Sequence, residues 1–350
     1  MLRARLIAHR NQFESALADF RDYPINGLSP LPLIAEPSPN HLFRQSAAAM
    51  YVQASVWHSG ILGQPGATLP FWVDPRDLTA VLAELERPPS KRLNPLVLCS
   101  VDTFPWSSTG VFNELLPGLP CDVEYLSTDY RRLILDAGGL PVFILDLPEP
   151  SQTVAAVLAH LQPDAVVLSS GLDIPQQFYS PATQVAEAQL LLTSPRKIIN
   201  LRALFLAAKR RRIPSLGVCR GMQAMGVFMD ARLYPHIEGH RNSLDLKTGV
   251  MTHRVEILTE DPLFSDSPVG KQFWANSLHH QALDDKLTEW ILPLARSVGT
   301  LHDCIEAIRL RDRKGLLPMW GIQFHLEKST CYDAARFRRF LELAREASPY

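Results

Sequence analysis

From residue 95 onward, short apolar segments alternate with helix-like segments, and this alternation is the feature that most constrains the fold. The apolar segments are PLVLCSV, VFILDLP, DAVVLSSG and IPSLGVC, and helix-like segments such as DYRRLILDAGGLP and NLRALFLAAKRRR lie between them. Strands that are apolar throughout are typical of parallel sheets covered by helices. We therefore predict an α/β fold with a mostly parallel central sheet and helices on both faces. Ligands of such sheets bind beyond the carboxyl ends of the strands.

Residues 1–90 have a different pattern. Helices are predicted over 3–22 and from Asp77, with Pro-rich and Ala-rich stretches between them, and a Pro-rich linker follows at 86–95. We divide the chain into a mainly helical N-terminal extension, 1–90, and a larger domain, 95–350. So small a segment buries little apolar area alone. Its aromatic residues are therefore expected to pack on the larger domain or, in a homo-oligomer, on a second subunit; they are Tyr51, Trp57, Phe71 and Trp72.

Charge and cysteine usage narrow the class of protein. The 35 basic and 36 acidic residues leave a net charge of -1, which predicts neither a nucleic acid nor a membrane surface as partner. The 5 cysteines are scattered without C-x-x-C spacing, so neither disulfides nor a zinc site is indicated. No apolar run reaches the ~18 residues of a membrane span, and no signal peptide is recognisable. We expect a cytoplasmic protein without cofactor or metal.

Cys219 lies between Gly217 and Gly221, directly after a predicted strand and before a predicted helix. Small neighbours permit the sharp turn of a nucleophile elbow, which exposes the central side chain at the edge of the sheet. A helix N-terminus also favours the thiolate. A buried, inert cysteine beside packing glycines would give the same triplet, but the flanking strand and helix favour a nucleophile.

His325 and Glu327 could serve that cysteine. They follow the apolar segment MWGIQF, and side chains at i and i+2 of an extended segment point to the same face. A cysteine nucleophile requires a base, and the base requires a group that orients it. A histidine at the end of a strand could equally meet solvent, so this pair is persuasive only together with Cys219.

The backbone N–H groups of Arg220 and Gly171 are the candidates for an oxyanion hole. Arg220 follows the nucleophile, and Gly171 lies in a small turn after another predicted strand. Donors at such positions can stabilise the negative oxygen of a tetrahedral intermediate. For Gly171 an ordinary strand-to-helix turn is the competing interpretation.

Six segments together resemble the class I glutamine amidotransferase-like superfamily, in particular its γ-glutamyl hydrolase branch. They are YRRLILDAGGLP (130–141), DAVVLSSGLDIPQQFY (164–179), LGVCRGMQ (216–223), NSLHHQAL (276–283), DCIEAI (303–308) and GIQFHLEKS (321–329). The chain departs from the family pattern at 169–171, where Ser-Ser-Gly replaces Pro-Gly-Gly, and at Leu326, where proline is usual. Residues 1–90 lie outside the resemblance.

The resemblance implies a catalytic triad of Cys219, His325 and Glu327 and a pocket for the glutamyl group. The residues implied to border that pocket are Gln223, Asn276, Ser277, His279, His280 and Gln281.

It also implies a hydrolase of a small γ-glutamyl amide that forms a thioester on Cys219 and releases glutamate. Arg220 favours the hydrolase branch. Two alternatives remain: a glutaminase that supplies ammonia to a synthetase partner, and a binding module with an inactive site.

Overall fold

The structure, a computed structural model, describes residues 71–74, 77–105, 122–125, 128–146, 150–183, 192–240, 253–328 and 332–347. The predicted helix over 3–22, the aromatic residues Tyr51 and Trp57 and the predicted oligomer interface of the extension lie outside these residues. The division at 90–95 and the oligomer stay predictions.

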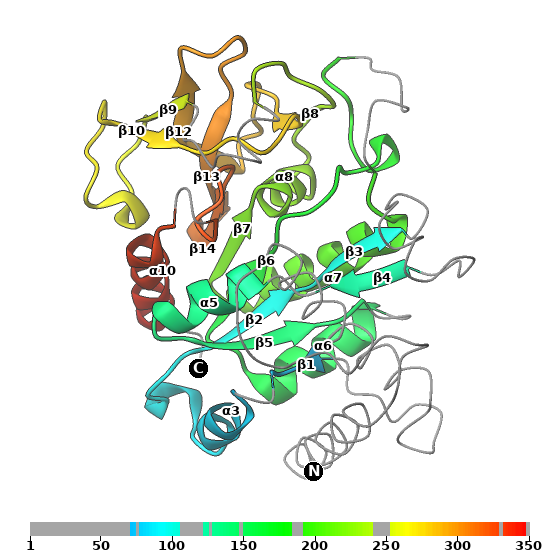
Figure 1. Cartoon of the computed structure of the whole chain (residues 1–350), viewed down its shortest axis with the longest axis vertical. Helices are drawn as coiled ribbons and strands as arrows, with labels where there is room; N and C mark the ends of the chain where they lie inside the picture. The colour runs from blue at the N-terminus through cyan, green and yellow to red at the C-terminus, as the bar shows by residue number, and fades with distance from the viewer. Residues whose placement is uncertain are drawn as a thin grey trace, which may run out of the picture.

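Ten of the described strands form a single sheet (Figure 1). Their order is β1 (Phe71–Trp72), β5 (Leu140–Ile144), β2 (Leu96–Ser100), β6 (Ala165–Leu168), β7 (Ser215–Val218), β14 (Gly315–Ile322), β13 (Ile305–Asp312), β12 (Ile291–Val298), β9 (His253–Ile257) and β10 (Gln272–Ala275). Strands β5, β2, β6, β7 and β14 are parallel, and antiparallel strands extend the sheet on both sides. The predicted parallel central sheet is thus confirmed.

Two short antiparallel pairs stand beside this sheet. They are β3 (Asp102–Pro105) with β4 (Asp122–Tyr125), and β8 (Leu233–Tyr234) with β11 (Ala282–Leu283). The α-helices among the described residues are α3 (Leu78–Leu85), α5 (Thr128–Asp136), α6 (Pro150–Leu161), α7 (Pro195–Arg211), α8 (Arg220–Val227) and α10 (Ala334–Glu346).

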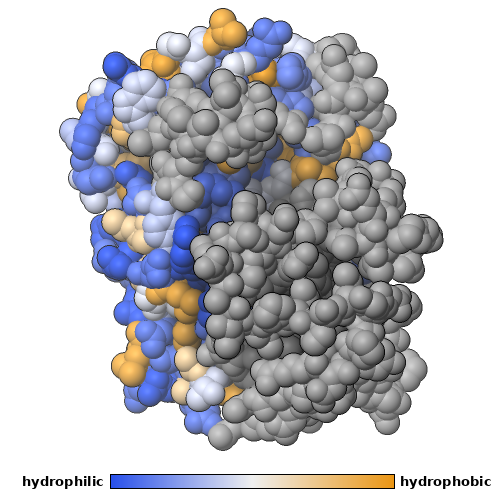
Figure 2. Space-filling view, in the orientation of Figure 1, coloured by the Kyte–Doolittle hydropathy of each residue, from blue (hydrophilic) through white to orange (hydrophobic). Residues whose placement is uncertain are grey.

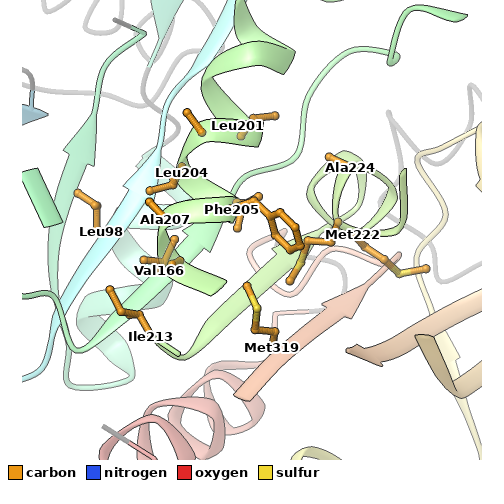
Figure 3. Packing of buried hydrophobic residues seen from close by; sticks show 14 of the residues in the cluster. Leu98, Val166, Leu201, Leu204, Phe205, Ala207, Ile213, Met222, Ala224 and Met319 are labelled. Carbon is orange, nitrogen blue, oxygen red and sulfur yellow. The ribbon is translucent and has the colours of Figure 1, made fainter. Parts of the chain in front are cut away.

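Alternation along the strands divides the core into two layers. In β2, Leu96 and Leu98 point into one apolar cluster, whereas Val97 and Cys99 point into the other. Helices α6, α7 and α8 contribute to the first cluster, and α5 and α10 to the second. Figure 3 shows the first layer, in which side chains of α7 and α8 lie over β2, β6 and β14. Helices therefore cover both faces, as predicted.

The last part of the N-terminal extension is joined to the larger domain. Strand β1 pairs antiparallel with β5, and Val81 of α3 is buried in the first core cluster. Arg131 of α5 donates two hydrogen bonds to Asp77, at 2.8 and 2.6 Å. The predicted linker is also anchored, because Arg92 pairs with Asp164 at 3.1 Å. The described residues between 71 and 95 thus pack on the larger domain.

Outside the core, the surface carries both polar and apolar residues (Figure 2). On the face drawn in Figure 2, apolar residues occur in small groups between polar ones, apart from the grey regions. Within the described ranges, no helix has both the length and the apolar character needed to cross a bilayer.

Candidate active site

Cys219 occupies the turn between β7 and α8 in a strained conformation. Its φ of 52° and ψ of -109° lie where L-residues are uncommon. The flanking glycines permit this turn: a Cβ on Gly217 would lie 2.5 Å from Met225 Sδ, and one on Gly221 would lie 2.0 Å from the Leu168 carbonyl oxygen. The turn predicted from the glycine spacing is therefore present, but the side chain of Cys219 is buried and not exposed as we expected.

His325 and Glu327 form a buried pair next to this turn. His325 Nδ1 lies 2.6 Å from Glu327 Oε1, and Glu327 is fully buried. The Cys219 N–H donates to the carbonyl oxygen of Ile322, at 2.7 Å, so the elbow is bonded to the end of β14. That strand ends three residues before His325, and Glu327 lies in a turn. The predicted contact forms, but a turn brings it about instead of the extended segment that we expected.

Opposing effects set the protonation of His325. Burial lowers the pKa of its imidazole, but the negative charges of Glu327 and of the Cys219 thiolate outweigh burial and raise it to about 10. Burial likewise raises the pKa of Glu327, and the charge and hydrogen bond of His325 bring it below its ordinary value. The second ring nitrogen, Nε2, has no hydrogen-bond partner among the described residues, and Cys219 is close enough to act on the same ring. At neutral pH the pair is an imidazolium beside a carboxylate.

Asn276 holds the backbone of His325 from the opposite side. Its side-chain Nδ2 donates to the His325 carbonyl at 2.9 Å, and its Oδ1 accepts from the His325 N–H at 2.8 Å. Both hydrogen bonds are buried, and together they restrict how residue 325 can move. We predicted Asn276 as a pocket residue, and the structure places it as a support for the histidine.

The turn at 169–171 is fastened by groups on three other elements. The buried Arg220 side chain donates to the Ser170 carbonyl at 3.0 Å, and Ser169 Oγ lies 2.9 Å from Ser100 Oγ. The Ser170 N–H donates to the hydroxyl of Tyr130 at 2.9 Å and is therefore occupied. The next N–H along the turn, that of Gly171, stays the candidate donor to an oxyanion. Sequence reasoning missed Tyr130 and Ser100, because their roles depend on which strands and helices are neighbours.

Gln223 and Gln281 connect α8 to the segment 276–281. Gln223 Nε2 donates to the Gln281 carbonyl at 2.7 Å and to Gln323 Oε1 at 3.1 Å. The Gln281 side chain in turn accepts from the Ile174 N–H at 2.9 Å. Both glutamines are buried, so they support the walls of the site. Contact with substrate stays a prediction for these residues.

The adjacent histidines of this segment point to different partners. His279 Nδ1 lies 3.0 Å from the Gln281 carbonyl oxygen, and its Nε2 lies 3.6 Å from Glu306 Oε1. His280 instead lies 2.8 Å from Asp173 Oδ2 and 2.9 Å from His236 Nδ1. The Ser277 hydroxyl donates to the His240 carbonyl at 2.7 Å. The predicted pocket residues are therefore divided between the wall near Asp173 and an interior cluster around Glu306.

Several known proteins are similar to this chain. Protein NtpR of Enterococcus hirae is 28% identical over 231 residues, which are 63% of this chain and 90% of that protein. A γ-glutamyl-γ-aminobutyrate hydrolase of Shigella flexneri is 30% identical over 218 residues, 58% of this chain and 79% of the relative. A crystal structure of a glutamine amidotransferase from Thermotoga maritima is 14% identical with a TM-score of 0.39, and covers 71% of this chain and 81% of that chain.

The family model of Peptidase C26 matches residues 119–327, which is more than half of the chain and includes Cys219, His325 and Glu327. These matches support a hydrolase. The chain belongs to the Peptidase C26 family, within the class I glutamine amidotransferase-like proteins.

Proposed function

We propose that this protein hydrolyses the γ-glutamyl amide bond of a small γ-glutamylated amine or amino acid and releases glutamate. The observation that carries the proposal is the set of three groups described above: a strained cysteine in an elbow, a histidine beside it, and a buried carboxylate 2.6 Å from that histidine. A relative named as a γ-glutamyl-γ-aminobutyrate hydrolase supports the substrate class.

In the proposed reaction, the Cys219 thiolate attacks the carbonyl carbon of the amide. The C–N bond breaks as His325 gives its proton to the departing amine, which leaves a γ-glutamyl thioester. Neutral His325 then takes a proton from water, the resulting hydroxide attacks the thioester, and the thiolate departs as glutamate forms. The protein is unchanged after both steps.

Glu327 and Asn276 act through His325 in this reaction. The raised pKa of the imidazole, about 10, favours a thiolate–imidazolium pair before substrate binds. Glu327 orients the ring through Nδ1, so Nε2 is directed to the sulfur and the leaving group. Asn276 holds the backbone, so the distance between ring and sulfur varies little.

The oxyanion would be stabilised by the N–H groups of Arg220 and Gly171. Arg220 is the first residue of α8, where N–H groups lack partners inside the helix. Its side chain also donates to the Ser170 carbonyl, so a single residue could supply one donor and hold the turn that carries the other. This double use explains why the arginine is buried.

The test is a panel of γ-glutamyl conjugates of different amines, with glutamate release as the readout. We expect rapid release from at least one conjugate and slow release of ammonia from glutamine. Mass spectrometry of acid-quenched protein should find a γ-glutamyl adduct on the peptide that contains Cys219.

The alternative, a glutaminase that serves a synthetase, shares the thioester, so the adduct alone does not separate the two functions. Faster turnover of glutamine than of every conjugate, with stimulation by a co-purifying protein, would overturn the hydrolase. No adduct and no release from any substrate would favour the inactive binding module.

A further inference from the structure

We propose that His240, His279, Cys304 and Glu306 form a zinc site next to the active site. One ligand atom from each of these residues lies within 4.8 Å of the others, and all four residues are buried. Cys304 Sγ lies 3.6 Å from Glu306 Oε1, and His279 Nε2 lies 3.6 Å from the same oxygen. None of the four is used by the proposed hydrolysis.

Hydrogen bonds to backbone carbonyls fix the tautomer of both histidines, so the nitrogen of each ring that faces the cluster carries a lone pair. His279 Nε2 has no hydrogen-bond partner among the described residues, whereas His240 Nδ1 lies 3.2 Å from the Ser277 hydroxyl, a contact that a bound metal would replace. His240 Nε2 lies 2.8 Å from the His302 carbonyl oxygen, and His279 Nδ1 lies 3.0 Å from the Gln281 carbonyl oxygen. A carbonyl oxygen only accepts, so each of these nitrogens carries the proton. The opposite nitrogens, His240 Nδ1 and His279 Nε2, then lie 3.9 and 3.6 Å from Glu306 Oε1. Histidine ligands of metals usually have this arrangement, in which the far nitrogen donates to a carbonyl.

Glu306 is a buried carboxylate that requires positive charge. It is fully buried, and its Oε2 has no hydrogen-bond partner in the described part of the chain. The same is true of His279 Nε2. His253 Nε2 lies 3.0 Å from Oε1, the same oxygen that lies near the other three members of the cluster. An uncompensated polar atom in the interior is costly, and a cation between these lone pairs removes that cost.

The donor set identifies the metal. Two imidazoles, a thiolate and a carboxylate are a combination that zinc binds tetrahedrally. Bond lengths of about 2.0–2.3 Å put tetrahedral ligand atoms roughly 3.3–3.8 Å apart. Glu306 Oε1 lies 3.6 Å from Cys304 Sγ, 3.6 Å from His279 Nε2 and 3.9 Å from His240 Nδ1, which is near that range, so small side-chain movements would close the site. Calcium and magnesium prefer oxygen ligands and are not expected here.

The site would stabilise the segment 276–281, because His279 belongs to it and Ser277 bonds to His240. That segment also includes Asn276, which holds His325. Glu306 adjoins the active site from the other side, since its carbonyl accepts from the Gln323 N–H at 2.8 Å. The zinc would thus fix the position of the segment without contacting substrate.

The experiment measures the metal content of full-length protein purified without a polyhistidine tag from zinc-supplemented cells. We expect about one zinc ion per chain by atomic emission. Cys304→Ser and His279→Gln should each retain less than about a tenth of that zinc. Cys99→Ala and His160→Gln are the matched controls, since Cys99 lies in strand β2 and His160 on an exposed part of α6, and both should keep wild-type zinc.

Cobalt substitution identifies the thiolate. The cobalt form should have a thiolate-to-metal charge-transfer band that Cys304→Ser abolishes and Cys219→Ser keeps. Circular dichroism checks that each variant is folded. If Cys304→Ser or His279→Gln does not fold, the more conservative substitution Glu306→Gln takes its place and should likewise lose zinc. Less than a tenth of an equivalent of zinc or cobalt in folded wild-type protein would overturn the site. So would a full equivalent that survives both Cys304→Ser and His279→Gln. Both readouts are independent of hydrolysis, so they do not depend on the proposed function.

Discussion

Two fully buried glutamates, Glu327 and Glu306, each lie beside histidine, and the pKa values of His325 and His240 shift in opposite directions. Glu327 lies beside a single imidazole, that of His325. The charges of Glu327 and Cys219 raise the pKa of this ring to about 10, although burial alone would lower it. Glu306 is shared by His240, His253 and His279. Burial and the neighbouring His279 lower the pKa of His240 to about 4.

The number of imidazoles per carboxylate explains the difference. One carboxylate can stabilise one imidazolium, and further rings near it repel added protons. The imidazole of His325 is therefore charged and suited to donate a proton, whereas His240, with its lowered pKa, presents a neutral nitrogen that is suited to bind a metal. The cysteines differ in position: Cys219 directly precedes helix α8, whereas Cys304 is buried next to Glu306, and burial and that charge raise the pKa of its thiol well above its ordinary value.

The largest expected effect separates these two cysteines. Cys219→Ser should lower kcat/KM by about 10⁴-fold or more, because a hydroxyl is scarcely ionised next to a base tuned for a thiol. Cys304→Ser should have a far smaller effect, because it removes no reacting atom. Steady-state glutamate release measures both variants, with Cys99→Ala as the control for a buried cysteine.

Comparable losses for Cys219→Ser and Cys304→Ser, with both proteins folded, would contradict this assignment. Labelling with iodoacetamide at neutral pH adds a second measurement. Peptide mass spectrometry should find Cys219 modified and Cys304 unmodified, since the raised pKa of Cys304 keeps its thiol protonated and a protonated thiol does not react.

The next prediction concerns the two members of the Glu327 pair. His325→Ala should lower kcat by about 10³-fold, and Glu327→Gln should cost roughly tenfold to a hundredfold less. The histidine transfers the proton, whereas the carboxylate orients and stabilises the ring. Single-turnover rates on the best conjugate would measure both. An equal loss, or a larger one for Glu327→Gln, would show that the roles are misassigned.

Replacing Asn276 should have a smaller effect, and it tests how far the active site and the proposed zinc site depend on each other. Asn276→Ala removes both hydrogen bonds to the backbone of His325, so kcat should fall about tenfold while KM stays close to wild type. The zinc content should be unchanged, because the two hydrogen bonds of Asn276 go to the backbone of His325, which is not one of the four proposed ligands. An increase in KM alone would instead place Asn276 in contact with substrate, as the sequence first indicated.

The smallest effect is on stability at alkaline pH. His325 has a pKa of about 10 in the folded protein, above the ordinary 6.5, so the folded state binds more protons between these values. Its contribution is fully present below pH 6.5 and is lost as pH rises toward about 10, with a slope of at most about 1.4 kcal/mol per pH unit. Urea unfolding of wild type and His325→Gln across this range tests it. Identical slopes would mean that the imidazolium contributes nothing to folding.

Local patterns in the sequence were sufficient for the sheet and for the nucleophile. Apolar strands between amphipathic helices predicted the parallel centre, and the glycines beside Cys219 predicted the elbow, because both depend on residues a few positions apart. The contact of His325 with Glu327 was predicted for the same reason, although a turn replaces the extended segment. Residues 1–70 are outside the described structure, so the predictions for them stay untested.

Only the tertiary structure decided what surrounds these residues. The sequence indicated no zinc site, because His240, His279 and Cys304 have no metal-binding spacing; strands β9, β12 and β13 must pair before His253 and Glu306 meet. Adjacent histidines at 279 and 280 face different partners for a similar reason, since the direction of each side chain depends on how segment 276–281 is held. Sequence spacing specifies local geometry, whereas contacts between distant segments depend on strand order and register, which no short pattern encodes.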